Sequence, residues 1–241
     1  MIKPTTSAEI AILPIQQGEI KFVILGTTPF YFNAMSEKAK REFLLPSGRK
    51  TATDKAVSLK HDPLAEYQNS VDRWHDDSRP TRLKIPAPAF KGAMCTAALV
   101  MPGTKKTEIG RLVWVADTHV DFYGVPKLSM DIVRTADPGH TPDIRTRAKV
   151  EKWACLVTVR FTKPNLTEMA VSNLLAAAGI VAGVGDFRQE KGKGNYGQFR
   201  LAERADPAVK ALLQTGGRKA QDIALKTPEP YDGDTADLYD W

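Results

Sequence analysis

The stretch from Gly179 to Arg200 combines residue types that could hold a strand of nucleic acid. It contains six glycines, four Lys or Arg residues and three aromatic residues. Glycine reaches positive φ and lets the backbone approach a ligand closely, cations bind phosphates, and aromatic faces stack on bases. A glycine-rich basic loop favours binding of a single strand, whereas a flexible surface hairpin is the alternative interpretation. The candidate binding residues in this loop are Gly183, Gly185, Phe187, Arg188, Lys191, Gly192, Lys193, Gly194, Tyr196 and Gly197.

A second basic cluster leads into the strand expected at residues 150–161. Arg145 and Arg147 could contact phosphates there, and a solvated strand start is the alternative. Strand alternation puts Arg147 and Trp153 on one side and Lys152 on the other. These two faces conflict, so the sequence does not show which side of the strand meets a ligand.

The C-terminal segment, residues 227–241, is acidic and ends in an aromatic residue. It holds five acidic residues, two prolines and no Lys or Arg, and it lacks helical periodicity. So few apolar groups would not offset the entropy of ordering the segment, and we therefore expect a disordered tail. The segment resembles the acidic, aromatic-terminated tails of bacterial and phage single-stranded-DNA-binding proteins. That resemblance implies competition with nucleic acid and a protein partner bound through Leu238, Tyr239 and Trp241, while a solubilising tail is the alternative.

Charge and composition favour a soluble protein with an anionic partner. The 241-residue chain has a formal net charge of +6, and because residues 227–241 carry −5, residues 1–226 carry +11. No apolar run approaches the roughly 20 residues of a membrane span, and the N-terminus lacks a secretory signal, so we expect a cytoplasmic protein without membrane contact. Cys95 and Cys155 lie in apolar surroundings without a C-x-x-C partner and should be buried free thiols.

The sequence offers no coherent catalytic or metal-binding set. The four histidines lack metal-ligand spacing, and no H-E-x-x-H, G-x-S-x-G or phosphate-loop motif occurs. We therefore expect no metal, no cofactor and no catalysis. The alternative is a nuclease that uses residues of the long polar segments as acid and base. The candidates for that role are His75, Asp137, His140 and Asp143.

Hydrophobic patterning predicts a mixture of strands and helices. Alternating or continuous apolar runs predict strands, and apolar residues at helical spacing predict helices. Phe90, Met94 and Ala98 form such a helical stripe. The expected strands are 18–26, 111–116, 118–123, 150–161 and 197–203, and the expected helices are 34–44, 85–101, 167–180 and 206–213.

Without two long loops, the order of these elements is close to βαββαβ, which is typical of ferredoxin-like and RRM-like folds. Residues 46–82 and 135–147 are too long and polar for ordinary connections and are interpreted as insertions. We expect one α+β domain over residues 1–226, with an antiparallel sheet and helices on one face, followed by the disordered tail. Another α+β sandwich is the alternative, because strand order cannot be inferred from one sequence.

Two segments resemble the RAMP superfamily, the RRM-like proteins of CRISPR effector complexes. Residues 85–94 (Ile-Pro-Ala-Pro-Ala-Phe-Lys-Gly-Ala-Met) are similar to its I-P-G-S-S-L-K-G-A-L-R helix start, with Ala87 and Ala89 in place of a glycine and a serine. The helix, glycine-rich loop and strand at 167–203 resemble its C-terminal G-rich loop. The resemblance implies that Lys91 lies near the nucleic-acid backbone. It is strongest to the backbone subunits, which polymerise along a guide RNA and carry long insertions.

The sequence therefore favours a non-catalytic, RAMP-like protein that binds single-stranded DNA or RNA without sequence preference and self-associates along the strand. The tail favours a phage-type replication or recombination role. Three alternatives stay open: a CRISPR effector backbone subunit that holds guide RNA, a RAMP-type endoribonuclease, and an inhibitor that mimics a CRISPR subunit. No feature reads a 2′-hydroxyl, so the sequence does not separate DNA from RNA.

Overall fold

The computed structural model describes residues 14–35, 44, 61–134, 142–191 and 194–240. Several sequence predictions concern residues outside these ranges. They are most of the helix expected at 34–44, residues 46–60 of the first insertion, Asp137, His140, Gly192, Lys193 and Trp241.

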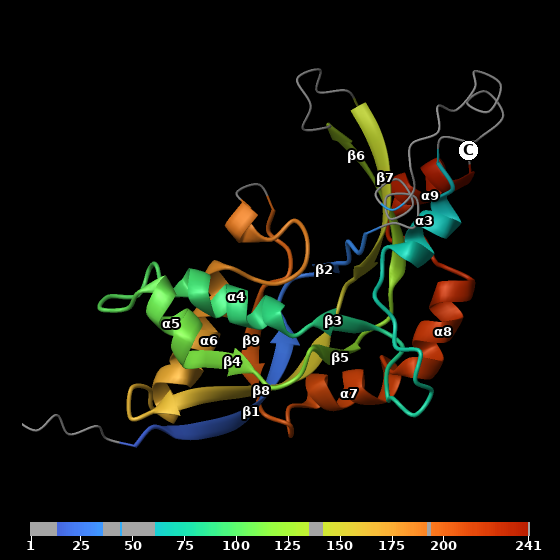
Figure 1. Cartoon of the computed structure of the whole chain (residues 1–241). Coiled ribbons are helices and arrows are strands. Elements are labelled where there is room, and N and C mark those ends of the chain that lie inside the picture. Colours follow the sequence, from blue (N-terminus) through green and yellow to red (C-terminus); the bar gives the residue numbers. More distant parts are fainter. Residues whose placement is uncertain (1–13, 36–43, 45–60, 135–141, 192–193, 241) are drawn as a thin grey trace, which may run out of the picture.

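The central sheet and two helices form the predicted ferredoxin-like α+β fold (Figure 1). The unit consists of β1 (Gln16–Gly26), α4 (Pro88–Ala97), β4 (Val113–Val115), β5 (His119–Tyr123), β8 (Ala154–Lys163), α6 (Glu168–Val181) and β9 (Phe199–Ala202). The last strand, β9, lies beside the first, β1, and β1 lies beside β8. The short strands β4 and β5 share the other edge of β8, and all these pairs are antiparallel. The expected RRM/ferredoxin-like order is therefore confirmed, with the second strand divided into two pieces.

Helices α4 and α6 cover one face of this sheet, as the sequence predicts (Figure 1). On β1, Phe22 and Ile24 are buried in the cluster with these helices, whereas the intervening Val23 packs in a separate cluster on the opposite face. Phe90 and Met94 of the predicted stripe on α4 are fully buried. Burial of each such side chain contributes about 1.5–3 kcal/mol, so this layer anchors the loops that leave it.

Helix α7 (Pro207–Thr215) packs on the opposite face of the sheet. Its buried residue Val209 contacts the cluster that includes Leu25 of β1. The side chain of Asp206 caps the helix by accepting an N–H of the first turn at 2.9 Å. The helix expected at 206–213 is therefore confirmed.

A second, three-stranded sheet extends from the first (Figure 1). Its hairpin consists of β6 (Lys127–Arg134) and β7 (Pro142–Val150), and β2 (Phe30–Tyr31) pairs with the base of β7. The sequence predicts a loop at 135–147 and one strand at 150–161. The structure corrects both predictions, because β7 begins inside the expected loop and ends where the expected strand begins, and β8 is a separate strand.

The first insertion contains an ordered part that packs against the hairpin. It includes α3 (Pro63–Asn69) and leads to β3 (Lys84–Pro86), which pairs with β5. The Tyr67 hydroxyl of α3 donates to the Ala224 carbonyl of α8 (Arg218–Lys226) at 3.1 Å. Further helices are α5 (Lys106–Leu112), the short 3-10 helix η1 (Gln189–Lys191) and α9 (Gly233–Asp240).

Candidate nucleic-acid interface

Glycines shape both ends of the loop that joins α6 to β9. Gly183 has a φ of +69° directly after α6 and donates its N–H to the Ala178 carbonyl at 2.9 Å, which ends the helix. Gly185 and Gly197 also have positive φ, a conformation that residues with side chains rarely adopt. Val184 donates its N–H to the Gly197 carbonyl at 2.9 Å, so the two ends of the loop lie together.

These glycines allow the loop to pack closely against itself. A Cβ on Gly197 would lie 1.7 Å from the carbonyl oxygen of Val184, and a Cβ on Gly194 would lie 1.4 Å from that of Phe187. Gly197 also donates its N–H to the Pro29 carbonyl at 2.8 Å, between β1 and β2. The sequence predicts that these glycines let the backbone approach a ligand closely. In the structure they let the loop approach its own backbone, which gives the loop a defined shape.

A cleft of about 290 Å³ lies between this loop, β2 and the first turn of α4. Gly185 and Arg188 line it from the loop, and Tyr31 lines it from β2. Pro86 lines it from the end of β3, and Ala89 lines it from the first turn of α4. The two segments that carry the RAMP resemblance therefore meet at one cleft.

The cleft contains features that favour an anion. Helix α4 begins after Ala87, and no side chain caps its first turn. Pro88 has no N–H, and the N–H groups of Ala87 and Phe90 are bonded to the carbonyls of Thr118 and Ala87, so the positive end of the helix dipole is what favours phosphate at this position. Arg188 adds a guanidinium, held by the Gly185 carbonyl at 2.9 Å and by Glu190 at 2.8 Å. Asp72 and Asp186 also line the cleft, and Asp186 is paired with Arg147, so the field is mixed rather than uniformly positive.

Arg147 is a buried structural residue, which corrects its expected place in an open groove. Its side chain is 5% exposed and forms ion pairs with Asp186 of the loop and, at 3.8 Å, with Asp131 of β6. Its guanidinium lies 4.3 Å from the centre of the Phe187 ring. Two carboxylates already neutralise this cation, so it is not free to bind a phosphate. Arg145, two residues earlier on β7, is exposed and stays a candidate.

The aromatic residues of the loop pack edge-on against a tyrosine of β2. The rings of Phe187 and Tyr196 lie 5.4 Å and 4.8 Å from the ring of Tyr31. Both are half-buried, so stacking on a base would use only the part of each ring that Tyr31 leaves accessible. Sequence reasoning missed Tyr31, because a tyrosine beside two phenylalanines has the pattern of an ordinary core residue.

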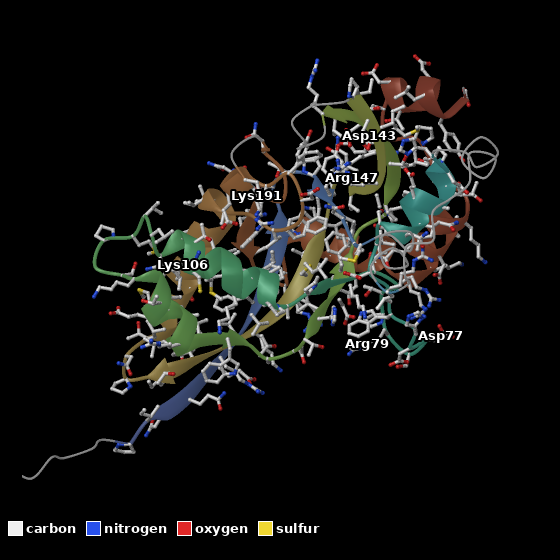
Figure 2. The ribbon with its side chains drawn as sticks, turned by 45° about the horizontal axis from the view of Figure 1, so that its top comes forward. Asp77, Arg79, Lys106, Asp143, Arg147 and Lys191 are labelled. Atoms are coloured by element: carbon white, nitrogen blue, oxygen red, sulfur yellow. The ribbon has the colours of Figure 1, made fainter. Side chains whose placement is uncertain are left out.

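Two of the predicted lysines lie on or beside α4. Lys191 is exposed at the end of η1, and Figure 2 shows it on the loop, away from Arg147 at the base of the hairpin. Glu190 accepts a hydrogen bond from Thr96 of α4 at 2.7 Å, which ties η1 to this helix. Lys91 is half-buried in the first turns of the same helix. The structure therefore brings Lys191 close to the helix that carries Lys91.

The C-terminal segment is docked on β6, which corrects the mobile tail that the sequence predicts (Figure 1). Tyr231 donates its N–H to the Leu128 carbonyl at 2.8 Å, and the Thr235 hydroxyl accepts an N–H of β6 at 3.4 Å. Leu238 packs against the main core, so it is not free for a partner, whereas Tyr239 is 38% exposed. These contacts offset the entropy of ordering, and composition alone does not show them.

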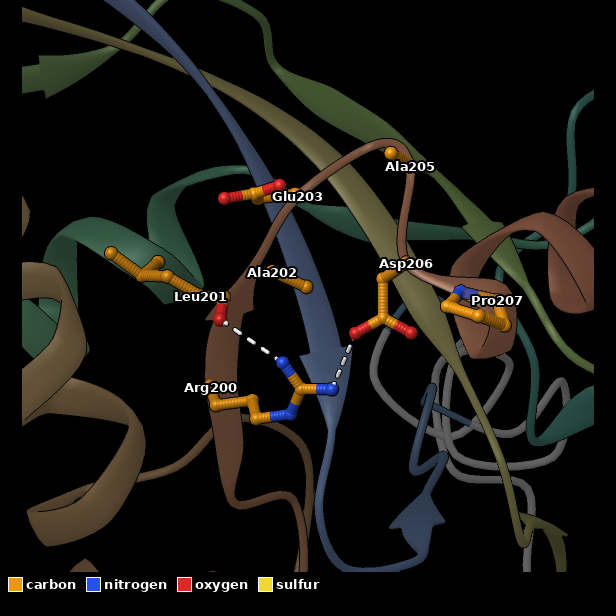
Figure 3. Close-up of a pocket in the computed structure, with 7 residues that line it drawn as sticks. All are labelled: Arg200, Leu201, Ala202, Glu203, Ala205, Asp206 and Pro207. Atoms are coloured by element: carbon orange, nitrogen blue, oxygen red, sulfur yellow. Dashed lines mark hydrogen bonds and ion pairs between the residues drawn. The ribbon is translucent and has the colours of Figure 1, made fainter.

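A second hollow, at β9, is larger but less suited to an anion (Figure 3). It has a volume of about 700 Å³ and is lined by residues between Arg200 and Pro207. Arg200 donates to Asp206 at 2.6 Å and to the Leu201 carbonyl at 3.4 Å. Glu203 adds a second negative charge to the lining. Asp206 also caps the start of α7 in this hollow, whereas no side chain caps α4, so this hollow does not favour a phosphate.

The described part of the chain contains no group of three His, Cys, Asp or Glu side chains placed to hold a metal ion. Of the nuclease candidates, Asp143 lies 3.3 Å from Nε2 of His61. Cys95 and Cys155 are buried free thiols, as the sequence predicts, and burial raises the pKa of the Cys155 thiol well above its usual range. No helix within the described ranges is long and apolar enough to cross a membrane.

No protein-family model matches the sequence, and no curated protein gives a significant match to it. Among solved structures, the chain is similar to Cmr6 from Pyrococcus furiosus. That match covers 78% of this chain and 98% of the Cmr6 chain, at 13% sequence identity and a TM-score of 0.38. Function is therefore inferred below from the residues of the cleft and from the sequence motifs that meet there.

Proposed function

We propose that the protein binds single-stranded nucleic acid along the cleft between α4 and the glycine-rich loop. The observation that carries this proposal is the meeting of the uncapped start of α4, the Arg188 guanidinium and the Tyr31 ring at one cleft. A phosphate would lie at the first turn of α4, and a base would stack on the accessible part of Phe187 or Tyr196. These contacts use backbone groups and ring faces, so binding would not depend on base sequence.

The charge of the chain supports this proposal. Residues 1–226 carry +11, and Lys191 and Arg145 offer exposed cations beyond the cleft. The described residues that line the cleft include no histidine and no cysteine, and of its two aspartates, Asp72 and Asp186, the latter is paired with Arg147. We therefore propose that the protein holds the strand and does not cut it.

The docked C-terminal segment changes the balance between the candidate roles. The likeness to single-stranded-DNA-binding tails implies a mobile segment, whereas α9 is folded against β6. The RAMP motifs, by contrast, meet at the proposed site. We therefore place a strand-holding subunit of a CRISPR-type complex, bound to RNA, ahead of a phage-type replication or recombination protein. Self-association along the strand belongs to the same proposal, and the exposed Ile132 on the projecting hairpin offers an apolar contact to a neighbouring copy.

Fluorescence anisotropy with labelled single-stranded RNA and DNA tests this function. Displacing about five or more counterions from a single strand should give a log–log salt slope of about −4. Changing Arg188 and Lys191 together to alanine should weaken binding about tenfold at low salt, because both cations lie in or beside the cleft. If the CRISPR-type role holds, the double substitution should lower the affinity for RNA more than the affinity for DNA.

The matched control removes the same charge from two residues that do not line the cleft. Lys210 of α7 and Lys219 of α8 are exposed, and their joint replacement by alanine should change affinity much less. Equal losses in the two double variants would mean that net charge, rather than the cleft, determines binding. No binding of either polymer at low salt would overturn the proposal.

A further inference from the structure

Three tyrosine rings surround the ammonium of Lys149 on β7. The ammonium nitrogen lies 3.6 Å from the centre of the Tyr231 ring, 5.0 Å from that of Tyr31 and 5.1 Å from that of Tyr196. Tyr31 belongs to β2, Tyr196 to the glycine-rich loop and Tyr231 to the C-terminal segment. An ammonium beside ring faces is the combination that binds the phosphate and the base of a nucleotide.

Lys149 is held out of water in this arrangement. The residue is 6% exposed, and its burial lowers the pKa of the ammonium. The carboxylates of Asp131, Asp232 and Glu151 oppose that shift. Tyr231 covers the ammonium most closely, and its hydroxyl donates to Glu151. Loss of the Tyr231 ring would therefore open Lys149 to solvent or to a ligand.

The cover over Lys149 is a short segment near the C-terminus, residues 229–240, which we call the C-terminal strap. Its helix, α9, has only eight residues, and Asp237 and Asp240 lie near its C-terminus, where the helix dipole disfavours negative charge. The strap is held by backbone hydrogen bonds to Leu128, by the Thr235 hydroxyl, by an ion pair of 3.0 Å between Lys127 and Glu229, and by the packing of Leu238 on the main core. Short elements that depend on docking are the first to open locally.

The covered site is continuous with the cleft. Tyr31 lines the cleft and also contacts Lys149. Alternation along β7 puts Lys149, Arg147 and Arg145 on one face of the hairpin, opposite Lys127, Ser129 and Asp131 of β6 respectively. A strand that leaves the cleft past Tyr31 would therefore meet Lys149 and then the exposed Arg145. The acidic strap lies over part of this basic face.

We propose that the C-terminal strap covers a second nucleotide site, formed by Lys149, Tyr31 and Tyr196, in which the Tyr231 ring occupies the place of a base. This inference rests on the proposed function, because its ligand is a further nucleotide of the same single strand. When the strap moves away, Asp232 leaves with it and Asp131 stays paired with Arg147, so a phosphate pairs with Lys149 while a base stacks on the tyrosines. The strap thereby lowers affinity until a strand in the cleft displaces it.

Chemical labelling of lysines tests the cover without any ligand. Acetylation followed by mass spectrometry should modify Lys149 slowly in the wild type and several-fold faster in Tyr231→Ala. Tyr239→Ala is the matched control, because it removes an exposed tyrosine from the same strap and should leave Lys149 protected. A wild-type Lys149 that reacts as fast as the exposed Lys210 would overturn the inference.

Strand binding tests the site itself. Tyr231→Ala should bind single strands about fivefold more tightly at low salt, which corresponds to about one additional stacked base. Adding Lys149→Gln to Tyr231→Ala should abolish this gain, and bound strand should protect Lys149 from acetylation in the single variant. If the wild type binds single strands and Tyr231→Ala binds them equally well or more weakly, the second nucleotide site is overturned and the proposed function still stands. Absence of binding in both proteins would overturn the proposed function and, with it, the nucleotide assignment.

Discussion

Replacing Gly197 with alanine should lower the free energy of unfolding by about 3 kcal/mol or more. Gly197 has a φ of +70°, and a Cβ there would lie 1.7 Å from the Val184 carbonyl oxygen. The clashing atom belongs to the backbone, which cannot move aside as the end of a flexible side chain can. The variant must therefore open the loop or shift β9. Thermal and urea unfolding, followed by circular dichroism, measures the loss.

Two other glycines separate the causes of this loss. Gly103 has a φ of +75° but open space where an added methyl group would lie, so Gly103→Ala should cost only the backbone term of about 1 kcal/mol. Gly92 lies inside α4 with nothing within 4 Å of such a methyl group, so Gly92→Ala should stabilise the protein by up to about 1 kcal/mol. If Gly197→Ala unfolds like Gly103→Ala, the two ends of the loop are not packed together as described.

Replacing Arg147 with alanine should cost about 3–5 kcal/mol of stability, the usual effect of removing one partner from a buried ion pair. The side chain is 5% exposed, and its removal leaves the carboxylates of Asp186 and Asp131 without their cation. It also removes the guanidinium that packs on the Phe187 ring. Because Asp186 belongs to the glycine-rich loop, the loop should loosen from the hairpin. Urea unfolding gives the loss of stability.

Arg145→Ala is the matched control for this variant. Arg145 lies on the same face of β7 but is exposed, so its loss should change stability by less than about 0.5 kcal/mol. Strand binding should rank the two variants in the reverse order. Arg145→Ala should weaken binding more than Arg147→Ala, because Arg145 is the cation that is available to the strand. Equal stability of Arg147→Ala and Arg145→Ala would contradict the buried position of Arg147.

The layer between the sheet and its helices could be predicted from the sequence. Alternation in β1 marks Phe22 and Ile24 as buried, and the stripe through Phe90 and Met94 marks the face of α4 that packs on them. Such periodic patterns can be recognised in the sequence because one face of each helix or strand is buried in the core. They determine the βαββαβ order. Residue types single out the glycine-rich loop, and the resemblance to the RAMP helix start singles out the beginning of α4; the two meet at the cleft.

The hairpin and the C-terminal strap could not be predicted in the same way. Pro142, Asp143 and the cations that follow them in β7 have the composition of a loop, and the segments that bury residues 146–150 are distant in the chain. Arg147 is charged and yet internal because Asp131 and Asp186 converge on it from β6 and from the loop. The strap is ordered by its contacts with β6, which no local pattern encodes.

Hydrogen exchange, measured by mass spectrometry with and without a saturating single-stranded RNA, tests the central claim most directly. The proposed cleft predicts slower exchange in residues 183–198 and 86–92 when the strand is bound. Helix α7, on the opposite face of the sheet, should exchange at an unchanged rate. Protection confined to α7 and the open face of the sheet, or no protection at a strand concentration that saturates anisotropy, would contradict the assignment of the binding site to this cleft.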